Sequence, residues 1–335
     1  MNKAYSFDDV LIVPKFSTVA SRSECRTEAY FPSLMLPVPV FAANMDTICG
    51  VKMAQKMHKL GGAGILHRYM KETETHNIIA DWDYVKDGKL IVSVGSMHHD
   101  KKRIDVVLTQ AKIEGKDIGM CVDLAHGDSQ HMLNTLEYIK DNKFSNLLIA
   151  GNVCTEMAAL RLFDFGADVV KVGVGPGSAC TTRIKTGCGY PQLCAIEACA
   201  KAGPVIADGG IRYYGDAAKA LAVGAYAVMV GGMLAGTDCT PGWDDEFGEM
   251  EFRGMASKRA KESCGGVPTN AEGVSTLVPK KAEGSTQEVV QELVEGIKSA
   301  MSYSGCRTLE EFRLYSELVS VTPSTVEENK PHIMG

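Results

Sequence analysis

The chain has 335 residues, of which 45% are hydrophobic, and its formal net charge is −6. This acidic balance gives no support for a nucleic-acid-binding surface, which would carry a basic excess, and no apolar run approaches the ~18 residues that a membrane span needs. The N-terminus lacks the apolar core of a secretory signal, and the 11 cysteines include no CxxC pair. We therefore expect a cytoplasmic protein with reduced thiols.

Eight short apolar runs recur along the chain, and amphipathic stretches lie between them. Continuous rather than alternating apolar runs are typical of parallel strands buried on both faces. Eight strand–helix units in roughly 200 residues predict a (β/α)8 TIM barrel, with a doubly wound open sheet as the alternative. The predicted strands are 38–42, 62–66, 90–94, 118–122, 146–150, 168–172, 204–207 and 225–230, and predicted helices include 51–60, 104–113, 129–140, 156–165 and 213–223.

The region after the last predicted strand departs from this repeat. Residues 237–276 are rich in Gly, Lys, Ser and acids, and an excursion this long in a compact domain is usually functional or disordered. We expect it to form a mobile flap over one end of the barrel. A closing helix over 283–303 and a flexible tail over 322–335 follow, so that residues 1–335 form a single barrel domain.

Polar or glycine residues follow every predicted strand. In a barrel these positions share the C-terminal rim, where active sites lie. A single such residue often only caps the next helix, but eight in register predict a site. They are Asn44, Asp46, His67, Arg68, Ser96, Asp123, Gly151, Asn152, Asp208, Gly209, Gly210, Gly231 and Gly232.

The last two strands end in glycine pairs, Gly209–Gly210 and Gly231–Gly232. Loops at these positions of a barrel often bind a phosphate through backbone N–H groups. Asp208 adds an acceptor suited to ribose hydroxyls, although it would otherwise cap the following helix. The pattern predicts a nucleotide phosphate site.

The segment KVGVGPGSACTTRIKTGCGYPQ, residues 171–192, begins at the end of the sixth predicted strand. Its glycines allow the backbone to approach a ligand closely. Cys180 lies among them near Arg183, so we interpret it as a nucleophile rather than one of the many structural cysteines. Gly175, Gly177 and Cys180 could instead, or in addition, turn carbonyl oxygens toward a monovalent cation. The His/Cys spacing of a zinc site is absent from the sequence.

Other titratable candidates are weaker. Glu272 would matter only if the flap folds over the rim. His67 and the pair His98–His99 are more typical of surface or structural residues than of catalytic ones.

The loop GPGSACTTR followed by KTGCGYPQ resembles the catalytic loop of the IMP dehydrogenase/GMP reductase family. The resemblance covers nearly the whole chain, since SFDDVLIVPKFSTVASR, ANMDT, DLAHG, AGNV, ADGG, VGGMLAG, FRGMAS and AEG occur in the family's order. Three features resemble the reductase branch. Residues 70–89 leave no room for a CBS module, no Arg-Tyr pair lies between Ser257 and Glu272, and CTTR and GYPQ match the reductase versions. An IMP dehydrogenase without a CBS module is the alternative, and a non-catalytic nucleotide-binding barrel is a third.

The resemblance implies NADPH-dependent reduction of GMP to IMP with release of ammonia. Cys180 as thiolate would add to purine C2, and the resulting thioimidate would be reduced by hydride. Thr182 and Glu272 match the family's proton-transfer pair. Because an ordinary glutamate is a poor acid at neutral pH, we expect Glu272 to be buried or to act through Thr182.

The resemblance also implies the binding residues. For GMP and IMP these are Ser178, Asp208, Gly209, Gly210, Gly231, Gly232, Gly254, Met255 and Gly273. For NADPH they are Ser21, Arg22, Arg68, Asp123, Leu124, Ala125, Val174 and Gly175. Ser21, Arg22 and residues 299–303 would complete the site of a neighbouring subunit in a homotetramer. A potassium ion would be held by Gly175, Gly177, Cys180 and Arg183.

The flap departs from the family at two positions. Ala256 stands where a serine is common, and Thr269 stands where an arginine is common, three residues before Glu272. These changes bear on purine selectivity and NADPH affinity. Lys258 or Lys261 could substitute for the missing arginine.

Overall fold

The computed structural model describes residues 3–83, 88–113, 115–144, 146–244, 247–265 and 269–331. Parts of the predicted flap, 245–246 and 266–268, and the last part of the predicted tail, 332–335, lie outside the described residues.

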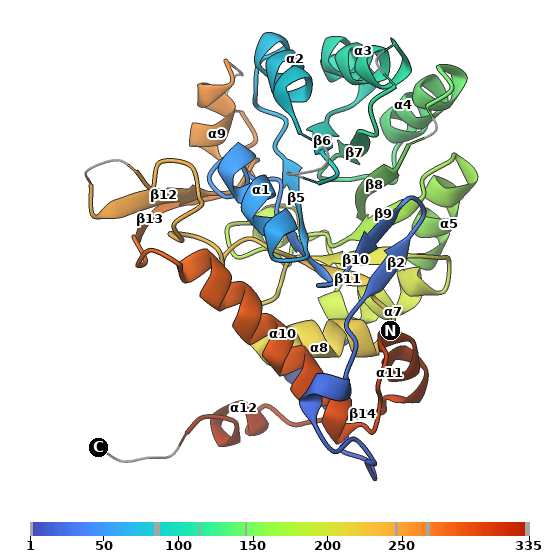
Figure 1. Cartoon of the computed structure of the whole chain (residues 1–335), viewed down its shortest axis with the longest axis vertical. Coiled ribbons are helices and arrows are strands. Elements are labelled where there is room, and N and C mark those ends of the chain that lie inside the picture. Colours follow the sequence, from blue (N-terminus) through green and yellow to red (C-terminus); the bar gives the residue numbers. More distant parts are fainter. Residues whose placement is uncertain are drawn as a thin grey trace.

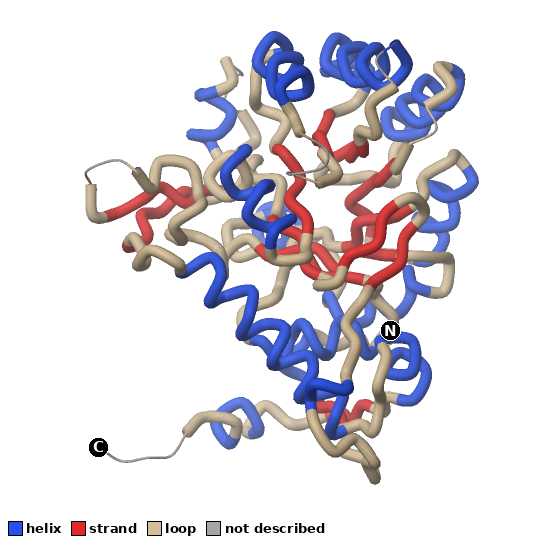
Figure 2. The backbone as a smooth tube through the Cα atoms, viewed as in Figure 1, coloured by secondary structure: helices blue, strands red, loops and turns tan. Residues whose placement is uncertain are grey.

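Eight parallel strands form a closed barrel in the order β10-β11-β4-β5-β6-β7-β8-β9 (Figures 1 and 2). The (β/α)8 prediction is confirmed, and the open-sheet alternative is wrong, because β9 and β10 pair in parallel and close the ring. All eight predicted strands are present. They are β4 (Val40–Ala42), β5 (Ala63–Leu66), β6 (Ile91–Val94), β7 (Gly119–Asp123), β8 (Leu148–Val153), β9 (Val169–Val172), β10 (Val205–Asp208) and β11 (Ala227–Val230).

Helices surround the barrel (Figure 1). Side chains of Ser129 and Thr155 accept hydrogen bonds from backbone N–H groups three residues on and so fix where two of the helices begin. The helices around the barrel are α1 (Val51–Lys59), α2 (Glu72–Asp81), α3 (Met97–Ile113), α4 (Gln130–Asp141), α5 (Glu156–Asp164), α7 (Gln192–Ala200) and α8 (Tyr214–Ala222). The longer α10 (Ser285–Tyr303) packs on α8, and the short α6 (Thr182–Thr186) buries none of its side chains.

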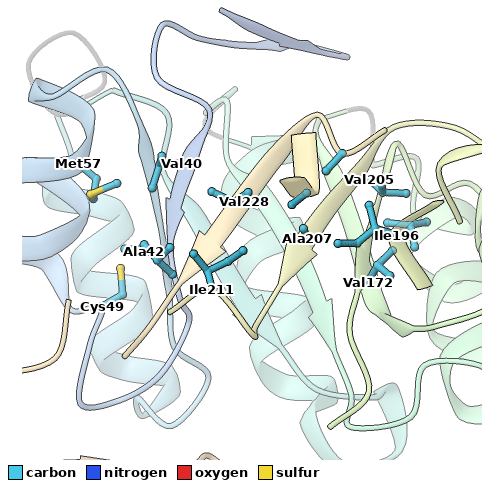
Figure 3. Packing of buried hydrophobic residues seen from close by; sticks show 14 of the residues in the cluster. Val40, Ala42, Cys49, Met57, Val172, Ile196, Val205, Ala207, Ile211 and Val228 are labelled. Carbon is cyan, nitrogen blue, oxygen red and sulfur yellow. The ribbon is translucent and has the colours of Figure 1, made fainter. Parts of the chain in front are cut away.

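The strands are buried on both faces, which explains their continuous apolar runs. Along β9, Val169 points into the barrel, and Val170 and Val172 pack outward against helices. Figure 3 shows the outward set, in which Val172 lies near Ile196 of α7. Alternation therefore determines which side chains of each strand reach the barrel interior.

The N-terminal end of the barrel is covered by a short hairpin, β2 (Ala29–Phe31) and β3 (Leu34–Leu36). The ring of Phe31 lies 6.0 Å from Phe41 of β4 and 5.9 Å from Tyr226, which precedes β11. This packing leaves the opposite, C-terminal end of the barrel available for a site.

Two further additions lie outside the barrel. Near the chain ends, β1 (Val10–Ile12) pairs antiparallel with β14 (Leu318–Ser320), beside η1 (Phe7–Asp9), η2 (Arg22–Glu24), α11 (Leu309–Tyr315) and α12 (Thr325–Glu328). Within 237–276 the structure has more order than a loop: β12 (Glu249–Arg253) pairs with β13 (Ser275–Pro279), and α9 (Lys258–Ser263) lies between them. Among the described helices, none has the length and apolarity needed to cross a membrane.

Candidate active site

A cavity of about 460 Å³ opens at the C-terminal end of the barrel. Residues at or after the ends of seven of the eight barrel strands line it, and β6 is the exception. Flap residues 252, 254–256, 261, 270 and 272 complete the wall. The predicted flap therefore does reach the rim, which is the condition under which Glu272 was expected to matter.

Cys180, Thr182 and Glu272 form one chain of hydrogen bonds in the cavity. The Cys180 thiol donates to the Thr182 hydroxyl across 3.2 Å, and that hydroxyl donates to the Glu272 carboxylate across 2.8 Å. All three residues line the cavity. This arrangement can move a proton between the reacting thiol region and a carboxylate through one hydroxyl.

Backbone contacts between the cysteine loop and the flap hold these groups together. Cys180 and Gly273 form an isolated antiparallel bridge. Thr181 donates its N–H to the Glu272 carbonyl at 3.0 Å, and Val274 donates to the Ala179 carbonyl at 2.9 Å. The distance between Cys180 and Glu272 thus depends on flap docking.

Glycine lets the cysteine loop fold tightly. Gly175 has φ of +84°, and a Cβ added there would lie 2.5 Å from the Arg183 side chain. Arg183 donates from Nε to the Val174 carbonyl at 3.1 Å and from Nη2 to the Tyr190 carbonyl. Arg183 and Val174 do not line the cavity. This arginine therefore stabilises the loop on the side that faces away from the cavity.

Two carboxylates and a lysine lie at the base of the cavity. Lys171 Nζ lies 2.6 Å from Asp123 Oδ1 and 2.9 Å from Asp208 Oδ2. Burial alone would lower the pKa of Lys171, but the two carboxylates raise it above its usual value. Burial would likewise raise the pKa of Asp123, and the Lys171 charge instead leaves that pKa below its usual value.

The two glycine pairs lie at the cavity wall with Ser178. Gly209 and Gly210 have φ of +90° and +83°, and a Cβ on Gly232 would lie 3.0 Å from the Ser178 hydroxyl. The alternative role of Asp208 as a helix cap is wrong. The N-cap of the following helix is Tyr213, and Asp216 in the first turn accepts hydrogen bonds from the N–H groups of residues 212 and 213.

Side-chain contacts attach the base of the flap to the barrel. Arg253 donates from Nη2 and Nε to Asp46 Oδ2 at 2.5 and 3.0 Å. Tyr69 donates its hydroxyl to the Met255 carbonyl at 2.5 Å. Of the two flap lysines, Lys261 lines the cavity, whereas the Lys258 side chain is 70% exposed.

Most of the predicted binding residues line this one cavity, but some do not. Those lining it are Arg68, Asp123, Leu124, Ala125, Gly175, Gly177, Ser178, Asp208, Gly209, Gly210, Gly231, Gly232, Gly254 and Met255. Gly273 does not line the cavity and forms backbone bridges to Cys180 and Ser257. Ser21, Arg22 and the 299–303 segment are absent from the lining and belong to η2 and α10, which pack on each other.

The histidine candidates lie outside the cavity wall. His67 accepts a hydrogen bond from the Tyr69 N–H at 3.2 Å, and burial lowers its pKa. The rings of His98 and His99 lie 4.5 Å apart, and neither lines the cavity.

Sequence reasoning assigned no role to several lining residues. Lys171 is the first residue of the 171–192 segment, and its burial was not predicted from the sequence. The sequence does contain a signal for this. A lysine inside an apolar strand needs a buried partner, because an unpaired buried charge would be very costly. The others that line the cavity without a prior prediction include Ala43, Met45, Tyr69, Phe252 and Asn270.

Comparison with known proteins agrees with this geometry. Residues 4–332 match the IMP dehydrogenase / GMP reductase domain. The chain is 38% identical to a GMP reductase from Vibrio vulnificus over 94% of both proteins. It is 34% identical to an inosine-5'-monophosphate dehydrogenase from Cryptosporidium parvum, over 99% of this chain and 96% of the relative. A GMP reductase variant from Trypanosoma brucei, solved in complex with guanosine 5'-monophosphate, superposes with a TM-score of 0.88, at 27% identity and covering 100% of this chain and 99% of the other. The chain therefore belongs to the IMP dehydrogenase/GMP reductase family.

Proposed function

We propose that the protein is a GMP reductase, which converts GMP, NADPH and two protons to IMP, NADP+ and ammonium. The observation that carries the proposal is the Cys180–Thr182–Glu272 hydrogen-bond chain in the barrel cavity. The names of the Vibrio and Trypanosoma relatives support the same activity. The products belong to purine nucleotide interconversion.

Cys180 is the proposed nucleophile. Its thiolate adds to purine C2, and the C2–amino bond breaks as ammonia leaves, which forms a thioimidate. Dividing the substitution into an addition and a reduction lowers each barrier. Glu272 acts through Thr182 to supply the proton that the departing amine takes up, because the hydroxyl lies between thiol and carboxylate.

When bound, a nicotinamide cofactor would supply a hydride to C2, and cleavage of the C2–sulfur bond would then release IMP and return Cys180. Arg68, Asp123, Leu124, Ala125 and Gly175 would hold the cofactor. The fit is supported by the Arg68 Nε atom, which is buried without a hydrogen-bond partner among the described residues. We propose NADPH rather than NADH, because Arg68 and Lys261 place two cations in the wall of the same cavity.

The nucleotide would bind along the other wall. Backbone N–H groups at the Gly209–Gly210 and Gly231–Gly232 pairs, together with Ser178, would hold its phosphate. Asp208 would accept from the ribose hydroxyls, and Gly254, Met255 and Gly273 would lie along the purine.

A monovalent cation, potassium, would be held by carbonyl oxygens of Gly175, Gly177 and Cys180, with Arg183 supporting the loop. The same loop contains the Thr181 hydroxyl, which is buried without a partner in the described chain. A neutral oxygen of this kind suits a singly charged cation. The role of the cation there would be structural, because it would fix the loop that carries Cys180.

We also propose a cytoplasmic homotetramer. Ser21, Arg22 and residues 299–303 lie on elements that pack together outside the chain's own cavity, as expected if they complete a neighbour's cofactor site. Light scattering of the purified protein tests the subunit number directly.

A steady-state assay tests the activity. The protein is incubated with NADPH or NADH and with GMP, dGMP, IMP or XMP, and the loss of reduced nicotinamide absorbance is followed. We expect turnover with GMP and NADPH, with IMP and ammonium as products, and higher rates in potassium than in lithium salts. Binding without turnover of any guanine nucleotide would contradict the proposal and favour a non-catalytic barrel.

The alternative is an IMP dehydrogenase without a CBS module, and the 34% identity to the Cryptosporidium enzyme is the observation in its favour. Formation of XMP from IMP and NAD+ at a rate exceeding GMP reduction would establish it. The flap sequence between Ser257 and Glu272 opposes it, since it contains no tyrosine.

A further inference from the structure

Lys171 uses all of its hydrogen-bonding capacity inside the protein. Its Nζ lies 2.6 Å from Asp123 Oδ1, 2.9 Å from Asp208 Oδ2 and 3.4 Å from Asn44 Oδ1. An ammonium has three N–H donors and no acceptor, so these three oxygens occupy it. Although Lys171 borders the cavity, it has no donor left for a ligand and is not suited to act as an acid.

Strand alternation explains why the three charges meet. Lys171 lies two residues after Val169 on β9, and Asp123 and Asp208 each lie two residues after an interior side chain of β7 and β10. All three therefore point into the barrel at its C-terminal layer. The Lys171 side chain is 1% exposed, but those of the two aspartates are 19% and 20% exposed. The ammonium is enclosed, and the carboxylates face the cavity.

The ammonium fixes one oxygen of each carboxylate. Asp208 Oδ2 accepts from Lys171 and also from Asn152 Nδ2 at 2.8 Å, which directs Oδ1 away from them. Asp123 is likewise held through Oδ1. In the proposed function, Asp208 belongs to the nucleotide wall and Asp123 to the dinucleotide wall, so one cation orients an acceptor in each.

We propose that Lys171 is a positioning residue shared by both subsites, and that through it the binding of nucleotide and of dinucleotide depends on a single buried ammonium. This inference rests on the proposed function. Without the ammonium, two carboxylates would share a largely enclosed site with Arg68 as the remaining cation that acts on Asp123, and their mutual repulsion would favour proton uptake by one of them. A protonated carboxyl donates where an acceptor is needed, so both ligands would bind less well.

Lys171→Met tests the proposal, with Lys171→Arg as the charge-retaining control. Calorimetry measures Kd for GMP and for NADP+ separately, from pH 5.5 to 8. For the methionine variant we expect both Kd values to rise at least about tenfold, the order expected for lost charged hydrogen bonds. We also expect a pH dependence across this range beyond that of the wild type, whose Kd values already change as the ligand phosphates ionise with a second pKa of ~6. The arginine variant should recover part of the affinity and most of the wild-type pH profile.

A purely structural role would lower the melting temperature without a new pH dependence of binding. Both Kd values within twofold of wild type, or weakening of one ligand only, would overturn the proposal. If the methionine variant does not fold, Asp123→Asn provides the test. Because Asp123 helps to hold the Lys171 ammonium that orients Asp208, this variant should weaken GMP binding as well as NADP+ binding. An effect confined to NADP+ would overturn the proposal that both subsites depend on Lys171. Failure of the wild type to bind GMP would overturn the proposed function and this inference together, whereas wild-type binding with unaltered variants overturns only the inference.

Discussion

Replacing Arg253 by glutamine should loosen the flap and reduce catalysis without unfolding the barrel. Arg253 donates two hydrogen bonds to Asp46 Oδ2, and the two side chains are only 14% and 8% exposed. Asp46 Oδ1 is already buried without a partner among the described residues. Removal of the guanidinium would therefore leave a nearly buried carboxylate with no compensating charge.

The free-energy cost of this substitution follows from the burial of the Arg253–Asp46 pair. Breaking a fully buried pair by removing one partner costs about 3–5 kcal/mol. Because some water reaches this pair, we expect about 2–3 kcal/mol, which corresponds to a ~30- to 160-fold change in an opening equilibrium at 1.36 kcal/mol per tenfold. The cost should appear locally, since Arg253 ends β12 and its partner lies after β4.

Amide hydrogen exchange of the β12–β13 peptides measures the opening, and kcat/KM for GMP measures the consequence. Arg259→Gln is the matched control, because Arg259 pairs with Glu251 on the same hairpin but is 65% exposed. An exposed pair contributes ~0–1 kcal/mol. Exchange rates and kcat/KM of the Arg253 variant within twofold of the Arg259 variant would refute the reasoning. A double variant with Asp46→Asn should lose less than the sum of the single variants.

Cys180→Ala should abolish NADPH oxidation and leave GMP affinity within a fewfold by calorimetry; retained turnover would exclude the thioimidate route. Glu272→Gln should lower kcat ~10²- to 10⁴-fold, as for loss of a general acid, with little change in KM; a KM effect alone would assign it to binding. The lowered pKa of Asp123, where burial is outweighed by the combined effects of the Lys171 ammonium, Arg68 and Asn44, contributes stability that is present above its ordinary pKa of 3.8 and is lost as pH falls through the lowered value. Asp123→Asn should thus flatten the fall in unfolding free energy below pH ~4, and an unchanged acid limb in urea titrations would contradict this. Lys261→Met should raise KM for NADPH, whereas the exposed-site control Lys258→Met should not; equal effects would exclude a specific contact.

The barrel could be predicted because its signal is local. Each strand is buried on both faces, so each appears in the sequence as an uninterrupted apolar run, as in 225–230. The pairing of β1 with β14 was not predictable in this way, since Val10 and Ser320 meet from opposite ends of the chain. No local pattern encodes such a partner.

The flap illustrates the limit more sharply. Along β12, Met250 and Phe252 are buried and alternate with charged neighbours, which is the pattern of a half-buried strand. This five-residue pattern is short and lies in a strongly charged segment, so it is a weak signal for a strand. Its partner β13 begins more than 20 residues later in the chain. Cys180 was identified from its own loop, but the relay through Thr182 to Glu272 spans 90 positions and exists only because the flap docks.

Lys171 was missed for a different reason. The predicted strand 168–172 includes Lys171, but a lysine is ordinarily expected at an exposed position, and only strand alternation and burial in the closed barrel reveal that it faces the barrel interior. The sequence did contain the compensating acids, Asp123 and Asp208, at the ends of two other strands. Their meeting depends on barrel closure, which joins strands that are distant in sequence.

The choice between reduction and hydrolysis turns on whether any tyrosine can activate water in this cavity. The flap has none between residues 257 and 272, but Tyr69 lines the cavity, and the Arg68 guanidinium lies 5.2 Å from its ring centroid. This pair cannot replace a hydrolytic base. The Tyr69 hydroxyl already donates to the Met255 carbonyl at 2.5 Å, and burial raises its pKa above the usual value, so the phenolate needed to take a proton from water is disfavoured. Tyr69 is therefore not placed to activate water for attack on a thioimidate at Cys180, which favours hydride transfer as the way to resolve that intermediate.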